Sequence, residues 1–153
     1  MTWVSNLFSN PFLLIPLSSW AIAQVLKVFI NAAVTHTWDL NRLFGDGGMP
    51  SGHSATVASL AVSAALHYGT ASFEFALAGI LAVIVCHDAM GVRLETGKQA
   101  ALLNDIVEAF NRLSAKELPA EQLKEFVGHT PLQVCAGVLI GILNAFFLYP
   151  RFF

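Results

Sequence analysis

The sequence predicts an all-α integral membrane protein, a bundle of about four transmembrane helices with an amphipathic helical loop between the third and the fourth. Hydrophobic residues make up 56% of the 153 residues and charged residues only 12%, whereas soluble domains carry about 25% charged residues. Several apolar stretches approach the length of about 20 residues that a bilayer-spanning helix needs. A soluble helical bundle with an unusually apolar core is the alternative. We expect residues 1–153 to form a single domain.

Four apolar segments are expected to cross the bilayer in turn. The second is short and rich in small residues, and the third has a polar C-terminal end. Trp3, Trp38 and Tyr149 lie near segment ends, where aromatic side chains anchor helices at the membrane interface. The four segments are residues 11–34, 54–71, 73–92 and 131–149.

The long loop of residues 94–130 holds most of the charge. Apolar residues recur in it at helical spacing, which predicts an amphipathic helix over residues 99–113. Leu118 and Pro119 then break the chain, and residues 120–126 are expected to form a second short helix. Both helices suit the membrane surface and a cap on the bundle equally well.

The distribution of Lys and Arg predicts the orientation. With four spans, the loop of residues 35–50 and the long loop share one side of the membrane, and only Arg151 lies on the other. The positive-inside rule makes the loop side cytoplasmic and places both termini outside. We expect a bacterial inner (plasma) membrane protein with its site facing the cytoplasm. The basic residues on the loop side are Arg42, Arg93, Lys98, Arg112, Lys116 and Lys124.

Polar residues of the apolar segments gather at that same end. Antiparallel packing would bring together residues from all four segments, and charges within membrane segments are costly and functional by default. Gln24 and Asn31 share a helix face with Lys27, which favours a function over a lysine that only extends to the interface. His36 and His67 are taken as incidental. The convergent set is Lys27, His53, His87, Asp88, Arg93 and His129.

Two of the expected helices start with features of an anion site. Ser51 is a candidate N-cap, Gly52 lets a phosphate approach the backbone, and His53 adds a titratable group. A plain helix cap is the alternative. Thr130 and Gln133 fit a capping box directly after His129.

Asp88 and a pair of glycines can each have a purely structural role. Asp88 opposes the dipole at a helix C-terminus, so Arg93 or a histidine is its natural partner, and a purely structural Asp88–Arg93 pair remains open. Gly137 and Gly141 form a small-xxx-small pair suited to close helix packing. The same pair offers a surface for self-association into a homo-oligomer.

The ordered set of motifs resembles a known family. The run from Pro50 to His53 is similar to the central motif of the type 2 phosphatidic acid phosphatase superfamily, which includes bacterial acid phosphatases and vanadium haloperoxidases. The run from His129 to Gly137 is similar to its last motif. Together with residues 48–54, 88–93, 99–100, 103–104, 123–125 and 128–131, these resemble the divergent branch of that superfamily over nearly the whole chain.

The resemblance implies a phosphatase that works through a phosphohistidine, without a metal or other cofactor. His129 would be the nucleophile and His53 the general acid. Ser51, Gly52, Lys27 and Arg93 would bind the phosphoryl oxygens. The superfamily has an Asp where this chain has Gln133, an amide that can orient the nucleophilic imidazole but carries no charge. Asp88 is a candidate for the missing carboxylate.

The sequence therefore predicts a membrane lipid-phosphate phosphatase that hydrolyses a phosphomonoester of the phosphatidylglycerol phosphate or phosphatidic acid type. Its expected partners are the lipid phosphate and the bilayer, and the net charge of −2 gives no reason to expect nucleic acid. The alternatives are a catalytically weak or inactive lipid or phosphate binder, a polyprenyl pyrophosphate phosphatase, and a metal-dependent enzyme using His87, Asp88 and His129.

Overall fold

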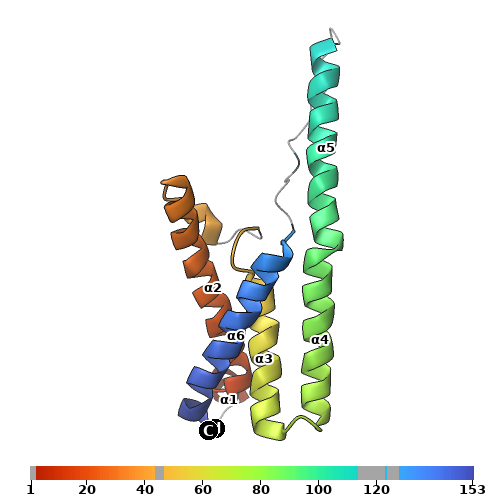
Figure 1. Cartoon of the computed structure of the whole chain (residues 1–153). Helices are drawn as coiled ribbons and strands as arrows, with labels where there is room; N and C mark the ends of the chain where they lie inside the picture. Colours follow the sequence, from red (N-terminus) through yellow and green to blue (C-terminus); the bar gives the residue numbers. More distant parts are fainter. Residues whose placement is uncertain (1–2, 44–46, 114–122, 124–127) are drawn as a thin grey trace.

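The computed structural model describes residues 3–43, 47–113, 123 and 128–153, with the backbone alone at residues 41, 42 and 93. Every regular element in these ranges is helical (Figure 1). The all-α bundle predicted from the sequence is therefore confirmed. In chain order the elements are α1 (Trp3–Phe8), α2 (Pro11–Thr35), the short 3₁₀ helix η1 (Leu40–Leu43), α3 (Gly52–Tyr68), α4 (Phe73–Met90), α5 (Val92–Leu113) and α6 (Pro131–Phe152).

The helix α3 lies at the centre of the bundle. It packs against α2, α4 and α6, while α2 and α4 make no contact with each other among the described residues. Its buried residues are almost all Gly, Ala and Ser, the small residues that let membrane helices approach closely. The predicted second span is thus a short helix enclosed by three others.

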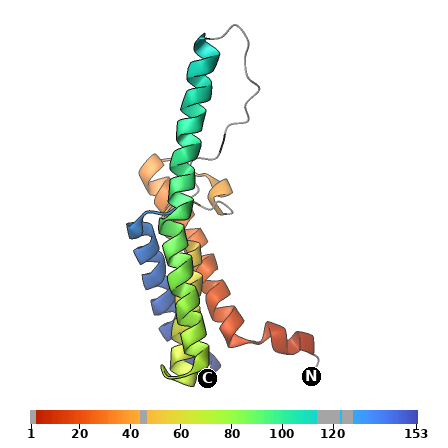
Figure 2. The same ribbon diagram turned by 90° about the vertical axis from the view of Figure 1, so that its right-hand side faces the viewer.

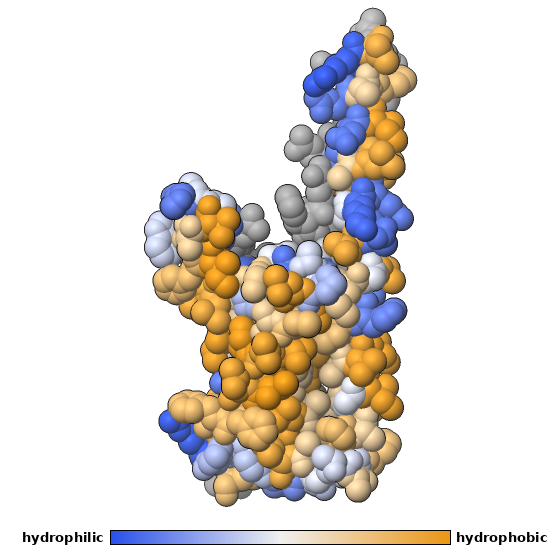
Figure 3. Space-filling model, viewed as in Figure 1, coloured by the Kyte–Doolittle hydropathy of each residue, from blue (hydrophilic) through white to orange (hydrophobic). Residues whose placement is uncertain are grey.

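Among the described residues, three helical stretches are long and apolar enough to cross a membrane: Pro11–Thr35, Phe73–Leu113 and Pro131–Phe152. Large apolar side chains cover the outside of the bundle between its two ends, as the band in Figure 3 shows. Leu17, Val83 and Leu139, for example, are 58%, 70% and 59% exposed. This inside-out distribution is what a lipid environment requires, and it supports the predicted membrane bundle over a soluble one.

Serine and threonine caps set where the helices begin. Ser51, Ser72 and Thr130 are the N-caps of α3, α4 and α6, each accepting a hydrogen bond from a backbone N–H of the first turn. Because capping fixes these starts, α3 begins two residues before the predicted span and ends at Tyr68 before Gly69. The other three spans agree with the predicted limits to within three residues.

The amphipathic helix α5 is longer than predicted and begins at Val92 instead of residue 99. Backbone bonds from Gly91 N to His87 O and from Glu95 N to Gly91 O carry the chain from α4 into α5. Both ribbon views show α5 continuing beyond α4, away from the bundle, rather than lying across its end (Figures 1 and 2). It therefore does not cap the bundle, and its place on the membrane surface stays a prediction.

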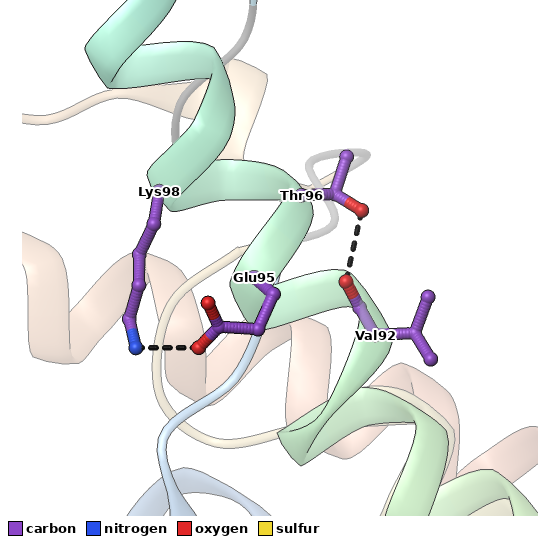
Figure 4. A network of polar contacts seen from close by, with 4 residues as sticks. All are labelled: Val92, Glu95, Thr96 and Lys98. Atoms are coloured by element: carbon purple, nitrogen blue, oxygen red, sulfur yellow. Dashed lines mark hydrogen bonds and ion pairs between the residues drawn. The ribbon is translucent and has the colours of Figure 1, made fainter.

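The first turns of α5 carry local polar contacts (Figure 4). Lys98 Nζ lies 2.6 Å from Glu95 Oε1, and Thr96 Oγ1 donates to Val92 O at 2.8 Å. Further along, the side-chain amide of Asn104 bonds both backbone groups of Leu123 at 3.0 Å. The predicted break at Leu118 and Pro119 and the second short helix lie outside the described residues.

The two ends of the bundle differ. The end of α2 and the starts of α3 and α6 lie at one end, and α1 and the last turn of α6 at the other (Figures 1 and 2). The far end is closed by aromatic rings: His67 packs 4.2 Å from Phe153 and 5.3 Å from Phe12 between ring centroids. His67 thus has a packing role there. His36 is the C-cap of α2, with a left-handed φ of 55°.

Helices α3 and α6 approach each other closely. A Cβ added at Gly137 would overlap the carbonyl oxygen of Ser51, and one at Gly141 would overlap that of Ala55. The close packing predicted for this glycine pair is therefore made inside the chain. Self-association through these glycines stays a prediction.

We expect Gly141→Ala to lower the unfolding temperature of the detergent-solubilised protein. The added methyl group has no room beside Ala55, and overpacking of this kind costs about 1–3 kcal/mol. Gly79→Ala on α4 is the matched control, because no atom lies within 4 Å of its added carbon. Both changes replace Gly by Ala within a helix, so both raise helix propensity equally. The difference between the two unfolding temperatures therefore reports the contact of Gly141 with Ala55. Equal unfolding temperatures would contradict this contact.

Candidate phosphate site at the loop end

Ser51 holds the start of α3 against the start of α6. Its side chain is fully buried, and its Oγ accepts from Ser54 N at 3.3 Å and from Ser54 Oγ at 3.0 Å. Its own N–H donates to the carbonyl oxygen of Gln133 at 3.0 Å. The backbone N–H of Ser51 is therefore used within the chain, and the N–H groups of Gly52 and His53 are those that the helix geometry leaves for an anion.

Gly52 also lies in tight packing. A Cβ at this position would lie 3.2 Å from Trp20 Cδ1 and 3.7 Å from Gln24 Oε1. The glycine thus lets α2 approach the start of α3. Its predicted role in phosphate binding remains a prediction.

The two imidazoles lie together, as predicted. The ring centroids of His53 and His129 are 6.5 Å apart, with 57° between the ring planes. His53 is in the first turn of α3 and is exposed, whereas His129 is only 2% exposed. One ring is accessible to solvent or substrate, and the other is held by the protein.

Three hydrogen bonds position His129 and its neighbours. Its backbone N–H donates to Ala89 O at the end of α4, at 3.0 Å. Its Nδ1 lies 3.2 Å from Gln133 Oε1, which also accepts from Thr130 N at 3.0 Å. An amide oxygen only accepts, so Nδ1 is the proton donor in this contact. The predicted capping box is present, and Gln133 joins the imidazole to it.

Lys27 and Gln24 are buried on the face of α2 that points into the bundle. Their side chains are 3% and 7% exposed. A lysine that merely extended to the interface would be exposed, so this alternative is wrong for Lys27.

Asp88 and its neighbours lie at the end of α4. Asp88 is half-buried and directly precedes Ala89, the residue that binds the backbone of His129. Arg93 is in the first turn of α5, and its side chain is outside the described part of the chain. Its predicted contacts with phosphate and with Asp88 therefore stay predictions.

His87 lies in the last turn of α4, next to Asp88. Its side chain is exposed, and no three His, Cys, Asp or Glu side chains among the described residues come together as ligands of a metal ion would. The metal alternative built on His87, Asp88 and His129 has no support in this geometry.

The sequence was compared with known proteins. The family model described as the Divergent PAP2 family matches residues 8–144. The chain belongs to the Divergent PAP2 family. It is 42% identical over 147 residues to the "Uncharacterized membrane protein YuiD" of Bacillus subtilis (strain 168), covering 90% of this chain and 93% of that protein. No solved structure matches the chain.

In this member of the Divergent PAP2 family, Trp20 was missed by the sequence analysis. It packs on Gly52 and lines a cavity beside His53. The available signal was its spacing: Trp20, Gln24 and Lys27 follow at i, i+4 and i+7 on one helix face.

We expect Gln133→Leu to remove the preference of the His129 ring for a proton on Nδ1. In the wild type, ¹⁵N NMR of the imidazole should show a protonated Nδ1 and an unprotonated Nε2, and in the variant this tautomer should no longer dominate. The buried ring also loses a partner, which costs about 1–3 kcal/mol of stability. Gln99→Leu, at an exposed position of α5, is the control. A wild-type ring protonated at Nε2 alone would contradict the bond to Gln133.

Proposed function

We propose that this chain is a membrane lipid-phosphate phosphatase that hydrolyses a phosphomonoester of the phosphatidylglycerol phosphate or phosphatidic acid type. The observation that carries the proposal is the pairing of an accessible and a buried imidazole, 6.5 Å apart between ring centroids, at the starts of two helices. Membership of the Divergent PAP2 family supports a relation to lipid phosphatases.

The two histidines suit the two halves of a phosphoryl transfer. The lone pair on His129 Nε2 attacks phosphorus, and the bond from phosphorus to the lipid oxygen breaks. His53, as an imidazolium, gives its proton to that oxygen, so the lipid alcohol leaves neutral. Water then attacks the phosphohistidine, His53 takes a proton from this water, and inorganic phosphate leaves with His129 restored.

The surroundings of the pair suit the charges of this reaction. The N–H groups at the start of α3 and the ammonium group of Lys27 would stabilise the transferring phosphoryl oxygens, with Ser51 and Gly52 forming the turn and Arg93 adding a second cation. Gln133 would keep the Nδ1 proton in place and so keep Nε2 nucleophilic. No step of this scheme requires a metal, and we expect turnover to survive treatment with a chelator.

The location of the site suggests which substrates reach it. The basic residues of the two loops favour a cytoplasmic position for this end of the bundle. Phosphatidylglycerol phosphate and phosphatidic acid on the cytoplasmic leaflet then fit better than a polyprenyl pyrophosphate on the opposite face. This orientation is part of the proposal.

A lipid-phosphate binder without turnover is the second candidate. The observation in its favour is Gln133, a neutral amide on the imidazole that becomes positive during the reaction. Replacing a carboxylate by an amide at the equivalent place in the Ser-His-Asp triad lowers kcat by about 10⁴-fold. Such a protein would keep the phosphate site and lose the chemistry.

We expect purified protein in detergent to release inorganic phosphate from phosphatidic acid or phosphatidylglycerol phosphate. His129→Ala should abolish release, and His53→Ala should lower it by about 10²-fold or more, because a general acid contributes about 10²–10⁴-fold. His67→Ala is the control, since His67 is on the same helix at the opposite end. If wild type and both variants match the blank, the phosphatase proposal is wrong and the binder is favoured.

We expect Asp88→Asn to separate two roles of that carboxylate. If Asp88 assists His129, turnover falls by about 10²-fold or more with the unfolding temperature unchanged. If Asp88 only pairs with a basic residue, the unfolding temperature falls and the folded fraction keeps its turnover. Full turnover at unchanged stability would remove Asp88 from the site.

A further inference from the structure

A cavity of about 380 Å³ lies beside His53, between residues of α2, α3 and α4. We call it the α2–α4 groove, because α3 forms its floor and α2 and α4, which do not touch each other, form its walls. Its volume is within the range of about 300–1,000 Å³ that is usual for small-molecule sites. Its lining residues are Leu17, Trp20, His53, Thr56, Val57 and Val85.

The polarity of the groove changes along its length. Leu17, Trp20, Gln24 and Lys27 follow one another on one face of α2, so this face is apolar toward the bilayer interior and polar toward the two histidines. The wall residues of α3 follow the same gradient: His53 lies at the polar end of the groove, and Thr56 and Val57 lie toward its apolar end. A molecule that matched both walls would have an anionic head and an apolar tail.

Gln24 supplies independent evidence for a polar ligand. Its side chain is 93% buried, and its Oε1 has no hydrogen-bond partner among the described residues. The same oxygen lies against Gly52 at the start of α3, next to the groove residue Trp20 and behind the groove lining itself. An unsatisfied buried polar atom is destabilising. A ligand beside Gly52 would give the amide a partner.

We infer that the α2–α4 groove holds one acyl chain of a phosphate-bearing lipid, which enters sideways from the bilayer, and that Gln24 bonds its glycerol part. The place of the phosphate, between His53 and His129, rests on the proposed function. Lipid tails are as apolar as the groove, so moving a chain into it gains little free energy. The groove acts by orienting the lipid, which directs the phosphate toward the site.

The groove can be tested by binding, without any turnover. In a Trp3→Phe, Trp38→Phe variant, Trp20 is the remaining tryptophan and reports on the groove. Phosphatidic acid with brominated acyl chains should quench its fluorescence more than brominated phosphatidylcholine at equal mole fraction. Val85→Phe, which fills the groove, should remove this difference, and Val83→Phe, at a position 70% exposed to lipid, should preserve it.

Each outcome decides between the two proposals. Equal quenching by both lipids, or a difference that Val85→Phe leaves intact, overturns the groove inference. Selective quenching by a protein that releases no phosphate supports the groove and overturns the phosphatase. Phosphate release without selective quenching supports the phosphatase and overturns the groove inference.

Gln24 has a matched control in Ser63, the other buried side chain whose polar atom has no partner among the described residues. Gln24→Leu and Ser63→Ala each remove an unsatisfied atom, so both should raise the unfolding temperature. Gln24→Leu alone should weaken phosphatidic acid binding in the quenching experiment, by about three- to tenfold for one lost hydrogen bond. Unchanged binding in Gln24→Leu overturns the role of Gln24.

Discussion

Two backbone hydrogen bonds join three helix ends, and the geometry of the candidate site depends on them. Ser51 N–H binds the carbonyl oxygen of Gln133, and His129 N–H binds that of Ala89. The first ties the start of α3 to the start of α6, and the second ties the segment before α6 to the end of α4. Because both bonds are between backbone groups, they fix the backbone positions from which the two imidazoles extend.

The rest of the bundle is consistent with this requirement. Small residues on α3 let three helices approach it, while bulky apolar residues face outward. Buried polar side chains are placed where partners exist: Asn144 Nδ2 on α6 bonds Ser18 Oγ and Ser19 Oγ on α2 at 2.8 Å. Lys27 and Gln24 are the polar residues of α2 that lie nearer the site, and Gln24 Oε1 remains unsatisfied among the described residues. This acceptor lies next to Gly52, where the inferred ligand would bond it.

Much of this arrangement could be predicted from local sequence. Cap residues and apolar runs gave the helices to within a few residues, and antiparallel order placed His53 and His129 at one end. The spacing of His129, Thr130 and Gln133 predicted the capping box. The interior position of α3 could not be predicted, because a short run of Ala and Ser does not specify which helices surround it. Nor could the groove beside Trp20, which exists because α2 and α4 stay apart. Nor could the start of α5 at Val92 be predicted. It depends on backbone hydrogen bonds that continue past Gly91, and a glycine typically marks the end of a helix.

The glycines of α6 impose an evolutionary constraint on the fold. The atoms that exclude a side chain at Gly137 and Gly141 are carbonyl oxygens of α3, and every amino acid carries that oxygen. A larger residue at either position therefore cannot be accommodated by trimming the side chain opposite it. A compensating change would have to shift a whole helix, so these two positions have no partner with which they can co-vary.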